Sequence, residues 1–309
     1  MSWPRPLQPA SGPFPEFKVE GARQGMGEWG AATSRLAEAG IVQPDMLTGL
    51  TLFILSSQPR DPNQRQEIKG GGGGVAGGVW VRERFAIYQP MRRGETFAVT
   101  GASLGRHVHK GRRYGTTSSE TRTAAGELLA ANLTTGLLAY RVQEGLEDAL
   151  EGADPDSLPA PAMGSPEIAA ANPHLEALRS AQAGEELVGT AVTVGLELMA
   201  ARDTSKPDNP IHSDPEAARK AGLARPIAGG SHVLAFALEL IMGRFGHEAL
   251  LHGATFDVRW KAPVEADAVI HPRVVVAEVN ASRVALDAEV KLASGATAMV
   301  ARIEVPLAS

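Results

Sequence analysis

The stretch SHVLAFALELIMGRF, Ser231–Phe245, decides the fold that this sequence predicts. Its apolar side chains occupy nearly every side of a helix, and Glu239 is the main exception. A helix that is apolar nearly all round is buried on nearly all sides. Most of the surrounding chain alternates in the manner of antiparallel strands, so we expect a sheet to wrap around this helix.

The chain repeats this plan in its two halves. Two pairs of segments are similar to each other: Phe85–Val99 with Val258–Pro272, and Thr123–Thr135 with Leu292–Glu304. Pro90 and Pro263 are 173 positions apart in the first pair, and Gly126 and Gly295 are 169 positions apart in the second. Duplication of one unit explains these offsets best. The predicted fold class is therefore α+β, a double hot-dog in which two antiparallel sheets each wrap around a central helix and join at their edges.

We expect three parts along the chain. Residues 1–150 form an N-terminal hot-dog domain around a buried helix at Pro44–Ser56, residues 151–182 form a linker, and residues 183–309 form a C-terminal hot-dog domain. The linker is predicted because Glu151–Pro173 is rich in Ala, Pro, Asp and Ser.

Three segments carry more local predictions. The N-terminal MSWPRPLQPASGPFPEF is expected to be a surface-hugging lead-in, and Leu187–Ala201 is expected to be a strand. The polar loop Ser56–Gly78 is long enough to be either functional or mobile. Its glycine run, Gly70–Gly74, lacks the Lys-Ser/Thr of a phosphate-binding loop, so a flexible hinge is favoured.

The composition excludes several classes of partner and chemistry. The chain has 309 residues, with 30 Lys and Arg against 35 Asp and Glu, and its net charge of −5 argues against nucleic acid or an anionic membrane as partner. The absence of cysteine excludes disulfides, thiol catalysis and Cys-ligated metals, and it fits a cytoplasmic location. No stretch approaches the roughly 20 apolar residues of a membrane span, and the N-terminus has no signal-peptide core.

The stretch ARDTSKPDNPIHSDPEAARKAGLARPIAGGSH, Ala201–His232, is the most informative for chemistry. Asp214 followed by Pro215 is typical of a helix N-cap, and Gly222 ends the short helix that they begin. The segment Arg225–Gly230 then brings the backbone to the start of the buried helix. The N–H groups there carry partial positive charge, so they stabilise an oxyanion without help from a side chain.

This stretch resembles the MaoC-like family of (R)-specific enoyl-thioester hydratases and dehydratases. The family signature is Asp-x-Asn-Pro-Ile/Leu-His-x-Asp, then a short Ala-rich helix, then Pro-Ile/Val-x-His-Gly. The matching positions are Asn209–Asp214, Ala217, Ala218, Gly222, Pro226, Ile227 and Gly230. The family has two-hot-dog members, whose first half contains a Pro-Leu-x-x-Gly-Asp stretch similar to Pro90–Glu95. The resemblance implies a hydro-lyase that reversibly adds water to a 2-enoyl thioester and gives a 3-hydroxyacyl thioester.

The resemblance also implies the substrate and the roles of the site residues. The substrate is an acyl-CoA or acyl-carrier-protein thioester of fatty acid metabolism, no cofactor or metal is needed, and we expect a homodimer. In the family a carboxylate and a histidine hold one water, and a backbone N–H near the glycine binds the thioester oxygen. Carried over, His212 is the general acid/base and the Gly230 N–H is the oxyanion donor, with Asn209, Ser231 and His232 as substrate-binding neighbours.

Two positions depart from the family pattern. The catalytic Asp of the family lies five residues before the His, where this chain has Pro207, and Asp208 is the nearby carboxylate. Asp208 either takes the place of the family Asp beside the shared water or caps a turn. Gly229 replaces the family's His before the glycine, and His232 either faces the cleft or packs at the helix start.

Two other functions fit the same residues: a catalytically reduced protein that binds an acyl thioester, and a hot-dog thioesterase. No Asn-Pro-x-His occurs before Asn209, so we predict that only the C-terminal half carries chemistry. The N-terminal half, with the Gly70–Gly78 loop, is expected to shape the acyl pocket. A basic hairpin with His107, His109 and Lys110 is interpreted as an exposed turn in preference to a coenzyme A phosphate site.

Overall fold

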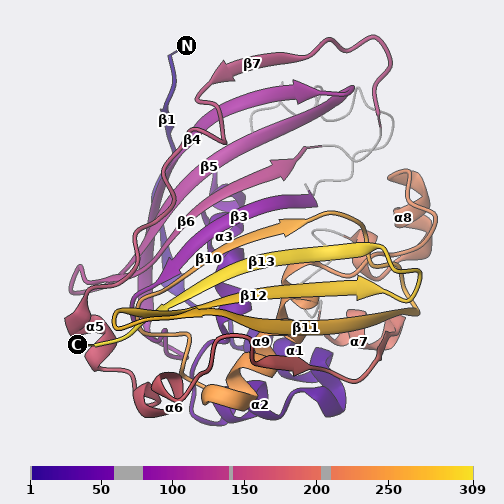
Figure 1. Cartoon of the computed structure of the whole chain (residues 1–309). Coiled ribbons are helices and arrows are strands. Elements are labelled where there is room, and N and C mark those ends of the chain that lie inside the picture. The colour runs from indigo at the N-terminus through magenta and orange to yellow at the C-terminus, as the bar shows by residue number, and fades with distance from the viewer. Residues whose placement is uncertain (1, 59–78, 139–141, 203–209, 309) are drawn as a thin grey trace.

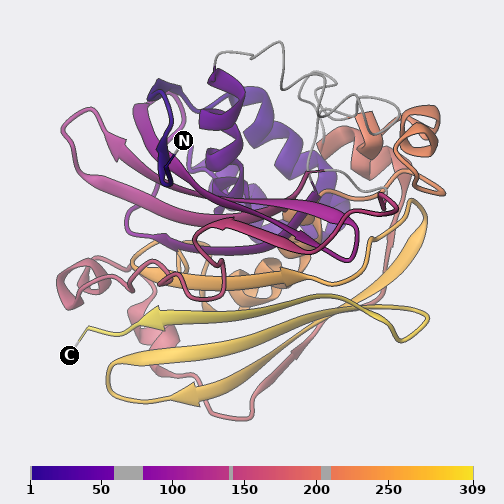
Figure 2. The same ribbon diagram turned by 90° about the horizontal axis from the view of Figure 1, so that it is seen from above.

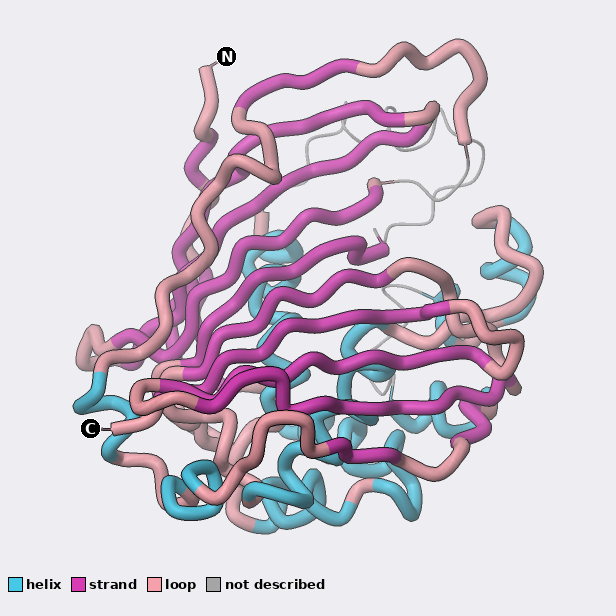
Figure 3. Tube along the Cα trace, in the orientation of Figure 1, coloured by secondary structure: helices cyan, strands magenta, loops and turns pink. Residues whose placement is uncertain are grey.

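The computed structural model describes residues 2–58, 79–138, 142–202 and 210–308. The strands form one large curved sheet, and most helices lie on one side of it (Figure 1, Figure 3). In this part of the chain every strand pair is antiparallel, and 13 strands belong to the sheet. The predicted α+β class is confirmed.

The sheet follows the order β1-β4-β5-β6-β3-β10-β13-β12-β11-β8, with β2 and β7 on β4 and β9 on β11. The strands before the middle of the chain are β1 Arg5–Pro6, β2 Ala10–Pro13, β3 Val79–Ile87, β4 Thr96–His109, β5 Arg112–Thr123, β6 Leu128–Leu137 and β7 Ala149–Gly152. The later strands are β8 Glu186–Val188, β9 Val192–Val194, β10 Ala254–Trp260, β11 Ala268–Val279, β12 Arg283–Leu292 and β13 Thr297–Pro306.

The two halves of the sheet join through β3 and β10. These strands pair along their length, and Phe85 lies opposite Phe256 with the two rings stacked 4.2 Å apart. An unpaired edge strand invites association with other chains, and this seam removes one edge from each half. The predicted edge-to-edge junction is confirmed.

Strand register confirms the internal duplication. The order β4-β5-β6-β3 of the first half mirrors β11-β12-β13-β10 of the second. Glu83 pairs with Thr134, and Phe256 pairs with Ile303, which reproduces the offsets of 173 and 169 positions seen in the sequence. The turns also match, since Gly126 has φ +87° and Gly295 has φ +86°.

The helices begin and end as follows: α1 Glu16–Met26, η1 Gly27–Trp29, α2 Ala31–Glu38, η2 Pro44–Gly49, α3 Leu50–Ser57, α5 Pro166–Ala170, α6 Leu175–Arg179, α7 Leu196–Arg202, η3 Pro210–His212, α8 Pro215–Lys220 and α9 Gly230–Phe245. Figure 2 shows the indigo helices of the first half on one side of the magenta strands. The expected central helix of the first half is thus present, as a 3-10 turn, η2, that continues into α3.

Helix α9 is the buried helix that its apolar sequence predicts. Its one inward carboxylate has a partner on another helix, because Glu239 accepts hydrogen bonds from the backbone N–H groups of Ala32 and Thr33 and from Thr33 Oγ1. These amides lie in the first turn of α2, where the helix dipole favours negative charge. Glu239 therefore caps α2 from a distance in sequence of more than two hundred residues.

The N-terminal lead-in includes two short strands, β1 and β2, which both pair with β4. One local prediction is wrong: Leu187–Ala201 is not one strand but parts of β8, β9 and nearly all of α7. β8 and β9 both pair with β11 with a short break between them, and the chain then enters α7, which packs against α1. Gly25 makes this packing possible, since a Cβ there would lie within 2.4 Å of Arg202 Cβ.

The segment after β7 runs along the outer face of the sheet. Arg84 donates to the carbonyls of Pro155 and Leu158, and Tyr88 donates to Ala162 O at 2.9 Å. The chain then forms α5 and α6, within the region expected to be a linker, and α6 packs against α9. Among the helices of the described ranges, none is long and apolar enough to cross a membrane.

Candidate active site

His212 is the last residue of η3, and its neighbour Ile211 packs near the start of β3. Ile211 and Ile227 form a small apolar cluster with two residues of the α8 region, and Val79 at the start of β3 packs against it. The site therefore lies where the second-half loop meets the first half of the sheet.

Ring nitrogen Nδ1 of His212 makes a short hydrogen bond to the backbone. Nδ1 lies 2.7 Å from Ile227 O, and a carbonyl oxygen can only accept, so Nδ1 carries the proton. In the neutral ring the lone pair is then on Nε2, which is the form that acts as a base. The loop is fixed from the other side as well, since Ile227 N donates to Ile211 O at 3.2 Å.

Asp214 caps α8, as its sequence predicts. Its Oδ1 accepts from Glu216 N at 2.8 Å and from Ala217 N at 3.3 Å, and Pro215 follows it at the first helical position. Gly222, with φ +90°, ends the turn after the helix. The Asp214 carboxylate therefore fixes the start of α8 directly after His212, and we assign it no part in proton transfer.

At the start of α9, Gly230 packs directly against the indole ring of Trp260. Trp260 Nε1 donates to Gly230 O at 2.9 Å, and a Cβ at Gly230 would lie 2.8 Å from the indole ring. His232 and Val233 are the first amides that bond within the helix, both to Gly229 O. The N–H groups of Gly230 and of half-buried Ser231 come before them, in the positive first turn.

His232 lies in the core at the same helix start. It is 2 % exposed, its Nε2 donates to Gly25 O at 2.8 Å, and its ring stacks on Phe236. Burial lowers the pKa of His232 to about 3, and the nearby charge of Arg202 acts in the same direction. Of the two placements left open by the sequence, this geometry favours packing, with the neutral ring joining α9 to α1.

A buried ion pair that the sequence did not predict lies beside this histidine. Arg202, at the end of α7, pairs with Asp45 of η2, and both side chains are almost fully buried. Arg202 Nη1 also donates to Ala22 O at 3.3 Å. These bonds join the end of α7 to the central helix of the first half, and the sequence carried no signal for them because the partners are far apart in the chain.

Several predicted residues lie elsewhere. Asp208, Asn209 and the Gly70–Gly78 loop are outside the described residues, so their roles stay predictions. The basic hairpin is exposed, and Asp148 accepts from Lys110 N at 2.8 Å and lies 3.0 Å from His109 Nδ1. Of the hairpin's basic side chains, His109 thus has a local acidic partner in Asp148.

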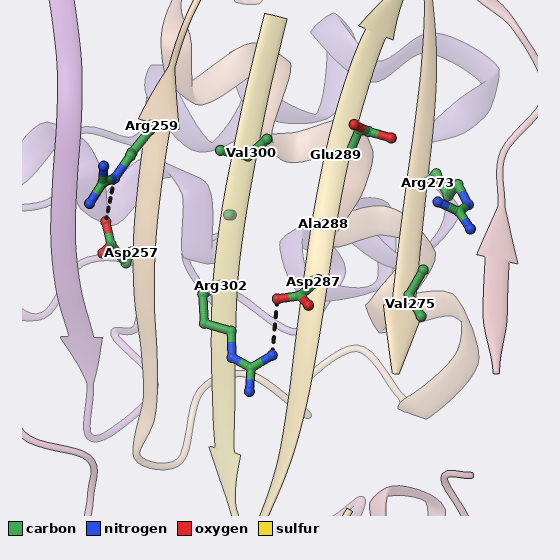
Figure 4. Close-up of a pocket in the computed structure, with 10 residues that line it drawn as sticks. Asp257, Arg259, Arg273, Val275, Asp287, Ala288, Glu289, Val300 and Arg302 are labelled. Atoms are coloured by element: carbon green, nitrogen blue, oxygen red, sulfur yellow. Dashed lines mark hydrogen bonds and ion pairs between the residues drawn. The ribbon is translucent and has the colours of Figure 1, made fainter. Parts of the chain in front are cut away.

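An open depression lies on the outer face of the second-half sheet, opposite the face that holds α9 (Figure 4). Its charged side chains pair with one another, as Arg302 does with Asp287 at 3.0 Å and Arg259 with Asp257 at 3.8 Å. The depression is separate from His212. The described residues contain no cluster of side chains that could hold a metal ion.

Comparison with known families places the site in a recognised domain. Residues 202–296 match the family model described as MaoC like domain. The resemblance of the Ala201–His232 stretch to the MaoC-like family is therefore confirmed, and the second half contains a MaoC-like domain. No protein among the curated sequences matches this chain.

Solved structures share the fold over nearly the whole chain. One described as a MaoC-like dehydratase covers 98 % of this chain and 98 % of its own, at 16 % identity and a TM-score of 0.66. A protein from Mycobacterium tuberculosis, described as having a double hotdog fold, covers 97 % and 96 %, at 12 % identity and a TM-score of 0.58. A Lactobacillus plantarum protein described as an oleoyl thioesterase covers 97 % and 96 %, at 11 % identity and a TM-score of 0.53. The double hot-dog fold is thus shared by proteins described as catalysing different reactions, and the fold alone does not choose between them.

Proposed function

We propose that this protein is a hydro-lyase that reversibly adds water to a 2-enoyl thioester and forms a 3-hydroxyacyl thioester. The observation that supports this most is the bond from His212 Nδ1 to Ile227 O, three residues before Gly230 at the start of α9. It combines a base of defined tautomer with backbone donors for an oxyanion, inside a MaoC-like domain.

The reaction uses these groups in turn. His212 Nε2 takes a proton from water, the water oxygen bonds to C3, and the electrons of the double bond move toward the thioester oxygen. The Gly230 N–H donates to that oxygen while it carries enolate charge. The proton then goes from His212 to C2, which restores the thioester. We propose Asp208 as the second group that holds the water.

The division of labour between the halves is part of this proposal. We propose that residues 183–309 carry the chemistry, that residues 1–150 shape the acyl pocket, and that residues 151–182 link them. The seam between β3 and β10 brings Val79 of the first half against Ile211 and Ile227, beside the proposed base.

Crotonyl-CoA tests the proposal when enoyl absorbance and free thiol are followed together. We expect absorbance to fall without thiol release, and His212→Gln to slow the reaction by about a hundred- to ten-thousand-fold. His109→Gln, on the exposed hairpin, is the matched control and is expected to retain full turnover. Equal losses in the two variants would contradict the assignment of His212.

The same assay separates the other functions. Thiol release identifies a thioesterase, and binding of crotonyl-CoA without either signal identifies a protein that only binds acyl thioesters. Asp208→Asn completes the series: a large loss there and in His212→Gln supports the pair, whereas a loss only in His212→Gln leaves a site led by the histidine.

A further inference from the structure

Three histidines and one glutamate gather where the region expected to be a linker meets the end of α9. His247, Glu248 and His252 belong to the connection between α9 and β10, and His174 directly precedes α6. The rings of His174 and His247 lie 5.1 Å apart at an angle of 63°. One carboxylate oxygen of Glu248 lies 3.8 Å from His247 Nε2, and the other lies 3.9 Å from His252 Nε2. We call these four residues the histidine cluster.

The histidine cluster is part of the contact that holds α6 on the second half. Helix α6 packs against α9, and Asn172 Nδ2, just before α6, donates to Ala249 O at 2.9 Å. The His174 ring lies on the backbone of Gly246, since a Cβ at that glycine would overlap the ring. This attachment therefore includes imidazole groups, which change charge near neutral pH.

Two of the histidines lie in surroundings that oppose a proton. His174 Nε2 and His252 Nε2 are buried and make no hydrogen bond with any described residue. A neutral ring can leave one nitrogen as a lone pair, whereas a protonated ring carries an N–H on both nitrogens. Protonation of either ring in this arrangement would leave an unpaired N–H in the interior, and that opposes protonation.

The charges around these rings limit protonation further. Burial lowers the pKa of His174 and of His252. The pKa of His174 is lowered further by His247 and by Arg35 of α2, and that of His252 is lowered further by His174. Glu248 acts in the opposite direction on both. A single carboxylate can balance one imidazolium, and a second imidazolium beside it is then repelled.

We propose that the histidine cluster is a pH-sensitive contact, which holds residues 164–180 on the second half at neutral pH and lets them open as the medium becomes acidic. This inference does not depend on the reaction proposed above. Opening exposes His174 and His252 to water, where they titrate near the ordinary histidine pKa of 6.5, whereas the closed form takes up protons only at lower pH. The closed form therefore has its full stability above that pH and loses stability as the pH falls below it.

Hydrogen exchange followed by mass spectrometry measures the opening. The reporting amides include Gly164 N, which donates to Gly253 O at 2.9 Å, and Leu178 N, which donates to His174 O at 3.1 Å. We expect the opening constant of residues 164–180, corrected for the effect of pH on chemical exchange, to rise about tenfold from about pH 7 to about pH 5. Strand β12, which lies between β11 and β13, is the internal reference and should show a smaller change.

Two variants should move the pH dependence in opposite directions. His174→Phe combined with His252→Phe keeps both rings and removes both titrating groups, so its opening constant should change by less than about twofold over the same interval. Glu248→Gln removes the carboxylate that favours protonation in the closed form, so its opening constant should rise more than that of the wild type. His271→Gln, exposed on β11, is the matched control and should keep the wild-type pH dependence.

Three results would overturn the proposal. They are a wild-type opening constant that does not change with pH, a double phenylalanine variant with the wild-type pH dependence, and a smaller rise in Glu248→Gln than in the wild type. A cluster with only a structural role would change the opening constant by the same factor at both pH values. The Glu248 side chain is 20 % exposed, so its replacement is mild and remains decisive where the double variant does not fold.

Discussion

Replacing Glu83 with glutamine should make the stability of this protein less dependent on pH. Burial raises the pKa of the Glu83 carboxyl from 4.5 to about 8, and the bonds from Asn132 and Thr134 offset only part of that effect. The folded state therefore holds a proton that the unfolded state releases above pH 4.5. Between these two pKa values, the free energy of unfolding of the wild type falls as pH rises.

The magnitude follows from the width of that window. One pH unit within it changes the free energy of unfolding by about 1.4 kcal/mol, so a rise from about pH 5.5 to about pH 7.5 costs the wild type about 2.5 kcal/mol through this group. Glutamine has nearly the shape of the protonated acid and does not titrate. Between these two pH values, the free energy of unfolding of Glu83→Gln should therefore rise by about 2.5 kcal/mol relative to that of the wild type.

Urea unfolding of both proteins at the two pH values measures this difference. Glu127→Gln, in the exposed turn between β5 and β6, is the control and should differ from wild type by the same amount at both values. A stability difference between Glu83→Gln and wild type that does not change with pH would refute the protonated, buried carboxyl.

Further substitutions test the packing. Gly230→Ala should lower the free energy of unfolding by about 1–3 kcal/mol, because the added Cβ meets the Trp260 ring. Turnover should fall as well; thermal melts measure the first effect and crotonyl-CoA kinetics the second. Glu239→Ala leaves the first amides of α2 unpaired in the core, and denaturant titration should show a loss of about 1–3 kcal/mol; an unchanged midpoint would refute the distant cap. Gly126→Ala and Gly295→Ala should each cost about 1–2 kcal/mol through their positive φ alone, and markedly unequal losses would argue against equivalent turns.

The architecture could be predicted because its signals are local. An apolar surface all round Ser231–Phe245 leaves burial as the only stable arrangement, and the Asp214-Pro215 cap and the turn glycines act on their own neighbours in the chain. The duplication was visible for the same reason, since similar residues recur at constant offsets. His212 and Gly230 stood out through a motif, which the MaoC-like domain match supports.

Leu187–Ala201 shows where local pattern fails. Its valines and threonines favour a strand, and two short strands do form, but the rest becomes α7 because α1 offers a glycine face on which a helix packs. That choice depends on a surface contributed by residues near the other end of the chain.

The sequence by itself determined that Ser231–Phe245 is buried, that a short helix begins after Asp214, and that one unit occurs twice. Only the tertiary structure decided which distant groups meet: Glu239 with α2, Arg202 with Asp45, and His212 with the Ile227 carbonyl that selects its tautomer. The spacing of apolar residues along the chain indicates which face of a helix or strand is buried, and this spacing can be read from the sequence alone. The partner of a buried polar group is set by folding, because only close packing brings a specific donor within about 3 Å of a specific acceptor.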